Sequence, residues 1–299
     1  MSPALQSVSR TALRARSVHA QRMSKRRSHA HDRGLSHDLL TLRKRELSRR
    51  TLLRSCAYTS LFAMVGCPTS ERVVLDAGGG DAAAGSSGDC TEIPEETAGP
   101  YPGDGSNGVN ALVLNGIVRS DIRSSFASAT GTAEGVPLNV TLTLVDPTDG
   151  CNPLAGCAVY LWHCDRDGNY SLYSSAIQQQ NYLRGVQEAD ANGQVRFQTI
   201  FPGCYSGRWP HIHFEVYESL EAATSGSKKL ATSQLALPKA TSELVYASSG
   251  YASSVANLSA TSLDSDMVFR DGVTSQLASV SGSVSAGYEA MLTVGVKLS

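Results

Sequence analysis

The sequence has little helical periodicity, no visible internal repeat and few histidines beyond residue 54, where only three of the seven lie. An uncharged, mostly apolar run at residues 55–66 has twelve residues, too few to span a bilayer, which takes about 20. These shortages disfavour a helical bundle, a repeat array and a membrane-spanning helix at this run. The chain of 299 residues is long enough for one or two domains.

Charge is divided unevenly along the chain, although the net charge is only −1. Residues 1–54 contain 14 lysines and arginines against three acidic residues, and the remainder contains 12 basic and 24 acidic residues. A basic arm of this kind can bind nucleic acid. The apolar run that follows the arm favours targeting instead, so we expect no nucleic-acid partner.

The junction between the basic arm and the apolar run is similar to a twin-arginine export signal. Residues 48–54 read Ser-Arg-Arg-Thr-Leu-Leu-Arg, with Arg49 and Arg50 as the pair, and the apolar run suits the central region of a signal peptide. Residues 64–67 read Met-Val-Gly-Cys and resemble a lipobox, in which Cys67 is lipidated after cleavage. We therefore expect residues 1–67 to be a disordered leader of an exported protein. That protein is either tethered to a membrane through Cys67 or released to the periplasm or the outside.

A second low-complexity segment follows the leader. Residues 68–95 are rich in Gly, Ala, Ser and Asp, a composition typical of a flexible linker. The sequence thus predicts a tether at residues 68–95 and a folded domain at residues 96–299.

The folded domain reads as a series of short strands. Apolar and polar residues alternate with a period of two, the signal of a half-buried strand, and residues 158–164 form a continuous apolar run typical of a strand buried on both faces. The alternating segments are residues 140–145, 195–200, 211–216 and 292–298. Residues 240–275 hold either short helices or irregular loops. This pattern predicts an all-β fold, an antiparallel β-sandwich.

Five cysteines lie beyond the leader, at positions 90, 151, 157, 164 and 204. An oxidising compartment permits disulfides. Cys151 and Cys157 bracket a turn-rich loop that can close a bridge, and Cys164 and Cys204 are a second candidate pair. Because five is odd, at least one thiol is free or bonded elsewhere.

A histidine pair offers the first chemical signal. His211 and His213 lie two apart on a predicted strand, so both imidazoles point to one face and can be aimed at one metal ion. The third histidine of the domain, His163, and its neighbour Trp162 fit a buried strand and are expected to be structural.

The residues around the pair resemble the intradiol ring-cleavage dioxygenases, the family of protocatechuate 3,4-dioxygenase and catechol 1,2-dioxygenase. The resemblance covers roughly residues 95–299 and rests on three segments read in order: residues 160–174, 182–216 and 231–237. It implies one Fe(III) per chain, with four ligands: Tyr170, Tyr205, His211 and His213. It also implies an active-site arginine at Arg208, a glutamine at Gln234 that positions the arginine, and a substrate-pocket residue at Tyr101.

Elementary chemistry agrees with this ligand set. Ferric iron is a hard acid that favours anionic oxygen with imidazole support, and a bound cation favours the phenolate form of a tyrosine. The resemblance implies that a catechol-type substrate and O2 react to give a muconate-type diacid. In this reaction Tyr205 helps to accept the substrate protons and Arg208 stabilises negative charge that develops on the ring.

Two other interpretations stay open at this point. The sandwich could be a lipid-tethered module that binds a metal or an aromatic ligand without turnover, although a pure binder needs neither Arg208 nor Gln234. The two histidines could instead hold zinc together with Cys164 or Cys204.

We predict that replacing both Arg49 and Arg50 with lysine leaves folded, iron-loaded protein in the cytoplasm. The twin-arginine route carries folded proteins, and a metal site rarely forms before the fold that builds it. Cell fractionation with iron analysis measures the outcome, and lysine replacements of Arg43 and Arg45 are the matched control. Normal export of the protein without the arginine pair would contradict the assignment of the signal.

Overall fold

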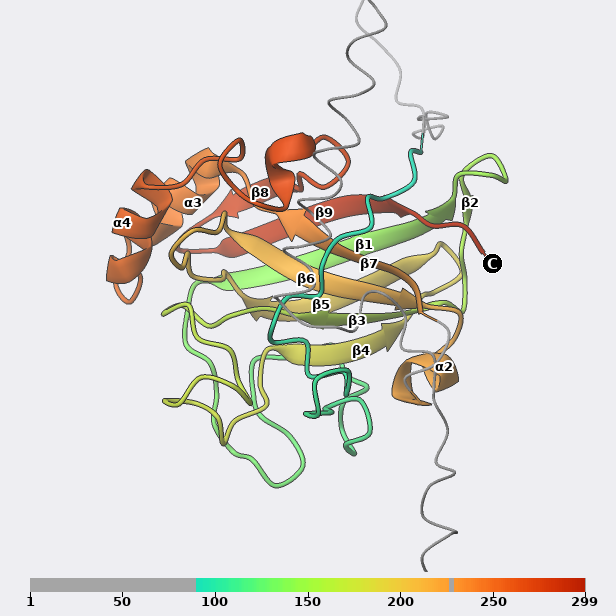
Figure 1. Cartoon of the computed structure of the whole chain (residues 1–299), viewed down its shortest axis with the longest axis horizontal. Helices are drawn as coiled ribbons and strands as arrows, with labels where there is room; N and C mark the ends of the chain where they lie inside the picture. The colour runs from blue at the N-terminus through green and yellow to red at the C-terminus, as the bar shows by residue number, and fades with distance from the viewer. Residues whose placement is uncertain (1–89, 226–228, 299) are drawn as a thin grey trace, which may run out of the picture.

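Strands dominate the computed structural model, which describes residues 90–225 and 229–298 (Figure 1). The strands are β1 (Pro137–Asp146), β2 (Asn152–Pro153), β3 (Ala158–Trp162), β4 (Arg184–Glu188), β5 (Gln194–Ile200), β6 (His211–Tyr217), β7 (Lys229–Ala236), β8 (Ser279–Ser283) and β9 (Gly287–Gly295). The helices are α2 (Leu220–Ser225), α3 (Lys239–Tyr246), α4 (Ala252–Ser259) and a short 3-10 helix (Phe269–Asp271). The leader predicted at residues 1–67 lies outside the described residues.

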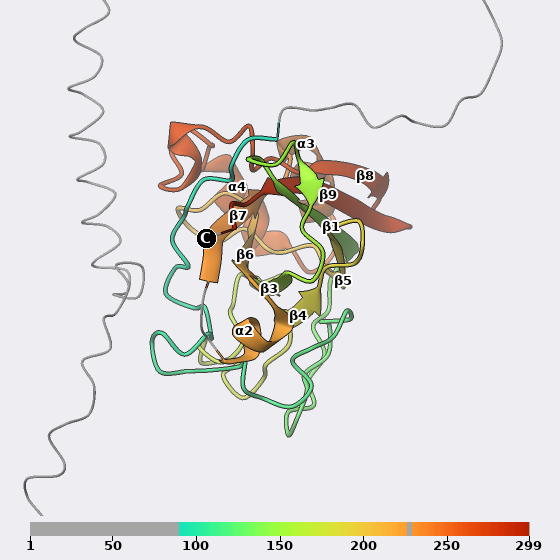
Figure 2. The same cartoon turned by 90° about the vertical axis from the view of Figure 1, so that its right-hand side faces the viewer.

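Two sheets pack against each other (Figures 1 and 2). The first has the order β2-β1-β9-β8, with β5 also paired to β1, and the second has the order β4-β3-β6-β7. The predicted all-β sandwich is confirmed. One strand pair differs from the antiparallel expectation, because β1 and β9 are parallel. Strands β2 to β8 lie between β1 and β9 in the chain, and parallel neighbours need a long connection rather than a tight turn.

The core lies between the sheets and is built from every second residue of the central strands. Its inward-facing residues include Val140 and Leu142 of β1, Leu161 of β3, and Ile212 and Phe214 of β6, all of which are buried. Because side chains alternate along a strand, the intervening residues of β3 and β6 point away from this core. That outer face of the second sheet is itself covered, since the segment around Leu112 and Ile117 packs on Tyr160 and Trp162.

Residues 90–102, the first that the structure describes, run across the strands, and we call them the covering segment (teal in Figure 1). Ile93 is buried in the core, Glu92 bridges to Gly295 at the end of β9, and the amide of Glu96 donates to the carbonyl of Thr232 on β7. The predicted linker therefore ends earlier than residue 95, because residues 90–95 pack on the domain. Residues 68–89 lie outside the described part of the chain.

The cysteines pair differently from our expectation. A disulfide joins Cys90 to Cys151, while Cys157, Cys164 and Cys204 are buried free thiols. The predicted Cys151–Cys157 and Cys164–Cys204 pairs are wrong. Cys157 packs in the core, and the other two thiols donate to backbone carbonyls of Gly203 and Arg208.

Two further expectations concern helices. The short helices α3 and α4 confirm one of the two alternatives for residues 240–275. Within the described ranges, no helix has the length and apolar character to cross a membrane.

We predict that Cys151→Ser lowers the free energy of unfolding by about 2–4 kcal/mol, because the disulfide restricts the unfolded chain. The bridge closes a loop with a sequence separation of 61. Urea unfolding followed by tryptophan fluorescence measures the change. Cys90→Ser and the double variant should show the same loss, and a reductant should not destabilise any of them further. A variant as stable as the oxidised wild type would contradict the prediction.

Candidate metal centre

One row of side chains crosses all four strands of the second sheet. The pairing register places Arg184 of β4 beside Trp162 of β3, Trp162 beside His213 of β6, and His213 beside Gln234 of β7. Directly paired residues of antiparallel strands project from the same face. All four side chains are buried, and the rings of Trp162 and His213 stack with centroids 5.0 Å apart. The row fixes the direction of His213 before any ligand binds.

The two tyrosines reach the histidine pair from loops that follow β3 and β5. The carboxylate of Asp165 accepts the amides of Asp167 and Asn169, which closes the turn that presents Tyr170. Gly168 in this turn has a φ of +86°, and a Cβ there would lie 3.0 Å from the Cβ of Tyr205. A glycine is therefore needed where the two tyrosine loops meet.

Four potential metal-binding atoms, one from each predicted ligand, lie close together where the tyrosine loops meet the histidine pair. The Nε2 of His211 lies 3.1 Å from the Nε2 of His213 and 3.1 Å from the hydroxyl of Tyr205. The hydroxyl of Tyr170 lies 3.1 Å from the Nε2 of His213 and 3.5 Å from that of His211. The two hydroxyls are 3.4 Å apart.

Burial makes this cluster electrically neutral in the absence of a cation. It raises the pKa of Tyr170 well above its ordinary value and the pKa of Tyr205 to about 12. It also lowers the pKa values of His211 and His213 well below the usual range, with Arg208 and the neighbouring imidazole adding to the effect. Uncharged phenols and imidazoles thus face one another in a poorly solvated pocket.

The spacing of the four atoms fits a shared metal ion. Ligands at about 2.0–2.1 Å from one ion, with angles of about 90–120°, lie about 2.9–3.6 Å apart. Five of the six separations among the four atoms fall between 3.1 and 3.5 Å. The Nδ1 of His211 contacts the carbonyl of Trp209. Because a carbonyl only accepts, this nitrogen carries the proton and the Nε2 presents a lone pair to the cluster.

Arg208 lies beside the cluster and is held by two buried partners. Its Nε donates to Asp266 at 2.9 Å and its Nη2 donates to Gln234 at 2.6 Å, while its Nη1 lies 3.4 Å from the Nε2 of His211. Burial lowers the pKa of Arg208, but Tyr205 and Asp266 outweigh this and the net shift is upward. The guanidinium is therefore charged and fixed in direction.

The covering segment passes directly over His213. Gln234 donates to the carbonyl of Thr97, and a Cβ on Gly99 would lie 3.4 Å from the imidazole of His213. The ring of Tyr101 lies 5.0 Å from that of Tyr170 and is partly exposed. All seven residues singled out in the sequence thus lie in or next to one cluster.

His163 stands apart from the cluster, as expected. Its Nε2 bonds the hydroxyl of Thr199 and its Nδ1 contacts the carbonyl of Cys164, and burial lowers its pKa to about 4. Trp162 is fully buried. Among the described residues, no group of three or more His, Cys, Asp or Glu side chains is arranged to hold a metal ion. The thiols of Cys164 and Cys204 bond to carbonyls, which removes support for the zinc alternative.

Asp266 is the site residue that sequence reasoning missed. One carboxylate oxygen accepts Arg208 and the amide of Trp209, and the other accepts the amides of Val268 and Phe269. It lies in the segment 240–275, where the sequence shows no motif, so no signal marks it. Only the fold brings it to Arg208.

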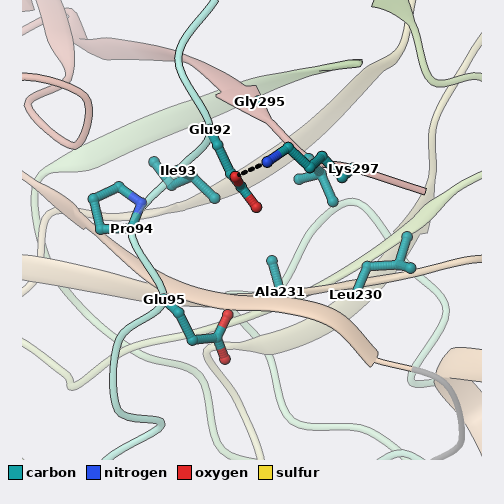
Figure 3. A pocket seen from close by; sticks show the side chains of 9 residues that line it. Glu92, Ile93, Pro94, Glu95, Leu230, Ala231, Gly295 and Lys297 are labelled. Atoms are coloured by element: carbon teal, nitrogen blue, oxygen red, sulfur yellow. Dashed lines mark hydrogen bonds and ion pairs between the residues drawn. The ribbon is translucent and has the colours of Figure 1, made fainter. Parts of the chain in front are cut away.

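Two surface hollows lie away from this cluster. One, of about 320 Å³, is a seam between the covering segment, β7 and the end of the chain, where Lys297 pairs with Glu92 (Figure 3). The other lies beside the β1–β2 turn. Neither contains any of the seven predicted site residues.

Comparisons with known proteins point in one direction. A family model described as "Dioxygenase" matches residues 119–224, a range that includes both tyrosines, Arg208 and both histidines. A chlorocatechol 1,2-dioxygenase from Rhodococcus opacus is 38% identical over 53 residues, which is 18% of this chain and 21% of that protein. An intradiol ring-cleavage dioxygenase from Tetranychus urticae superposes with a TM-score of 0.55 and 26% identity, covering 70% of this chain and 95% of that chain.

We predict that Asp266→Asn destabilises the domain by about 3–5 kcal/mol, the usual cost of leaving one partner of a buried ion pair alone. The NH2 group of the asparagine would also face N–H donors, from which it cannot accept a hydrogen bond. Urea unfolding measures the change. Asp264→Asn, at an exposed position two residues away, should shift stability by less than about 0.5 kcal/mol. Equal unfolding midpoints for the two variants would show that Asp266 does not hold Arg208.

Proposed function

This chain belongs to the intradiol ring-cleavage dioxygenase family, and we propose that it is a ferric-iron enzyme that cleaves a catechol-type aromatic ring with O2. The ring would open between its two hydroxyl-bearing carbons to give a muconate-type diacid. The observation that carries the proposal is the convergence of two phenol oxygens and two imidazole nitrogens within 3.1–3.5 Å.

The donor set suits ferric iron better than the softer divalent metals. Two phenol oxygens and two imidazoles are hard or borderline ligands, and the family uses non-haem iron. Tyr170, Tyr205, His211 and His213 would hold the ion. When bound, Fe(III) would act as a Lewis acid that keeps both tyrosines ionised and makes the bound catechol reactive toward O2.

Tyr205 is suited to accept a proton from the substrate. It is less buried than Tyr170, which is 1% exposed, so it is the tyrosine with more access to solvent. Burial raises its pKa to about 12, which makes its phenolate a strong base once it is released. Tyr170 and the two histidines, which are more deeply buried, keep their places.

Arg208 supplies a fixed positive charge where the ring becomes negative. Asp266 and Gln234 hold the guanidinium on one side, and its Nη1 faces the four-atom cluster. A charge that is already oriented stabilises a developing anion without reorganisation. This arrangement favours turnover over the alternative of a binding module without catalysis, for which such a charge has no use.

We further propose that the protein is exported and that the linker holds the domain away from a membrane when Cys67 is lipidated. The disulfide between Cys90 and Cys151 supports an oxidising compartment. An iron-loaded domain suits a route that carries folded proteins.

The test is oxygen uptake by purified protein with catechol, protocatechuate, hydroxyquinol and larger catechols, together with iron analysis and a visible spectrum. We expect red-brown protein, because ferric tyrosinate absorbs visible light, and oxygen uptake with at least one catechol.

Arg208→Ala should keep the iron and the colour but lose turnover by about 10²–10³-fold, whereas His211→Ala should lose most of the metal.

Colourless protein with stoichiometric zinc would overturn the metal assignment. Coloured protein that takes up no oxygen with any catechol would favour the binding module. Wild-type turnover by Arg208→Ala would exclude its electrostatic role.

A further inference from the structure

The row across the second sheet ends in a buried cation for which the proposed function has no role. Arg184 is 1% exposed and lies on β4, at the opposite end of the row from Gln234. A guanidinium has five N–H groups. Each of the five makes a hydrogen bond, and every acceptor is a carbonyl or hydroxyl oxygen.

These bonds join two segments that both face the candidate site. On one side, Arg184 donates to the carbonyls of Tyr101 at 3.0 Å and Pro102 at 2.7 Å. On the other side, it donates to the hydroxyl of Ser171 at 3.1 Å and to the carbonyl of Ser171 at 3.0 Å. Ser171 follows the ligand Tyr170 directly. Arg184 therefore fixes the position of Tyr101 relative to Tyr170.

The same covering segment is held at both ends of the row. Gln234 binds the carbonyl of Thr97 at one end, and Arg184 binds Tyr101 and Pro102 at the other. Between these anchors the segment crosses His213, with Gly99 against the imidazole. A shift of Arg184 would change the distance between this segment and the metal ligands below it.

The aromatic ring that Arg184 positions, that of Tyr101, is partly exposed, whereas the neighbouring Tyr170 is buried. Tyr101 lies 5.0 Å from Tyr170 and 5.3 Å from Tyr173 between ring centroids. The hydroxyl of Tyr173 accepts the amide of Gly103 and donates to Asn107, which supports the same loop from the other side. A catechol ring bound at the four-atom cluster would therefore lie close to the ring of Tyr101.

We propose that Arg184 is a positioning residue for the substrate, which it serves by holding Tyr101 in the wall of the site. The inference rests on the proposed function for the identity of the ligand, a catechol-type ring. Lysine cannot take over the role, because a single ammonium group lacks the planar fork that reaches two segments at once.

The experiment compares wild type, Arg184→Lys, Tyr101→Ala and the double variant. Catechol is titrated into iron-loaded protein without oxygen and followed by visible absorption. Hydrogen exchange is measured for the backbone amides between residues 101 and 108, apart from Pro102, which has none. We expect Arg184→Lys to keep its iron and colour, to exchange these amides faster and to bind catechol about 10–100-fold more weakly, as for a misplaced positioning group. In the Tyr101→Ala background, Arg184→Lys should have little further effect on catechol binding.

Arg123→Lys is the matched control. Arg123 is a partly exposed arginine that donates to both carboxylate oxygens of Asp121. These bonds do not involve residues 101–102, Ser171 or Arg184, so catechol affinity should stay at the wild-type level. If Arg184→Lys does not fold, Tyr173→Phe serves instead, since it loosens the same loop through Gly103 and should weaken catechol binding in the same direction.

Three results would overturn the proposal: wild-type catechol affinity in Arg184→Lys, unchanged exchange of residues 101–108, or an equal loss of affinity in the presence and absence of Tyr101. A wild-type protein that holds no iron and binds no catechol would refute the proposed function. In that case the exchange measurement still shows whether Arg184 holds the segment that contains Tyr101 and Pro102.

Discussion

The direction of alternate side chains on β6 is the constraint on which the site depends. Ile212 and Phe214 point into the core, so His211 and His213 must point out of it. The neighbouring strands are in register, and Trp162 and Gln234 therefore flank His213 on the same face. A one-residue slip of β6 would bury the imidazoles between the sheets and expose the core residues to the site. The core that stabilises the sandwich is thus also what aims the ligands.

Burial also determines the protonation state of the side chains in the cluster. A dry pocket keeps phenols protonated and imidazoles neutral, which is why the pKa values of Tyr170 and Tyr205 rise and those of His211 and His213 fall. The fixed cation at Arg208 is balanced by Asp266, whose carboxylate is fully buried. The pocket is therefore neutral apart from the oriented pair of Arg208 and Asp266. Because solvent screens charges poorly there, a bound metal cation would change the ionisation of the two tyrosines far more than it could at an exposed site.

Local signals in the sequence reveal the parts of the site that lie on regular strands and marked turns. The period of two predicts that His211 and His213 share a face, and turn residues before Tyr170 and Tyr205 mark the loops that carry them. Asp266 and Arg184 could not be predicted in this way, since each acts through contacts between distant segments. The Cys90–Cys151 disulfide escaped for the same reason: its partners are 61 residues apart, whereas the turn at Cys151–Cys157 suggested a local bridge. The parallel pairing of β1 with β9 likewise joins the first strand to the last. Short-range sequence patterns carry no information about such a distant pairing.

The covering segment also has a consequence for the order of assembly. Its residues come first in the domain, but Glu92 pairs with Gly295, the last residue of β9, and Glu96 docks on β7. The segment can dock fully only once β7 and β9 are in place, because its partners lie on these two strands. The four ligand atoms come from residues 170 to 213, and both strands follow these residues in the chain. The cover over His213 therefore depends on contacts of much longer sequence separation than those that bring the four ligands together, and such contacts carry the larger entropic cost of loop closure.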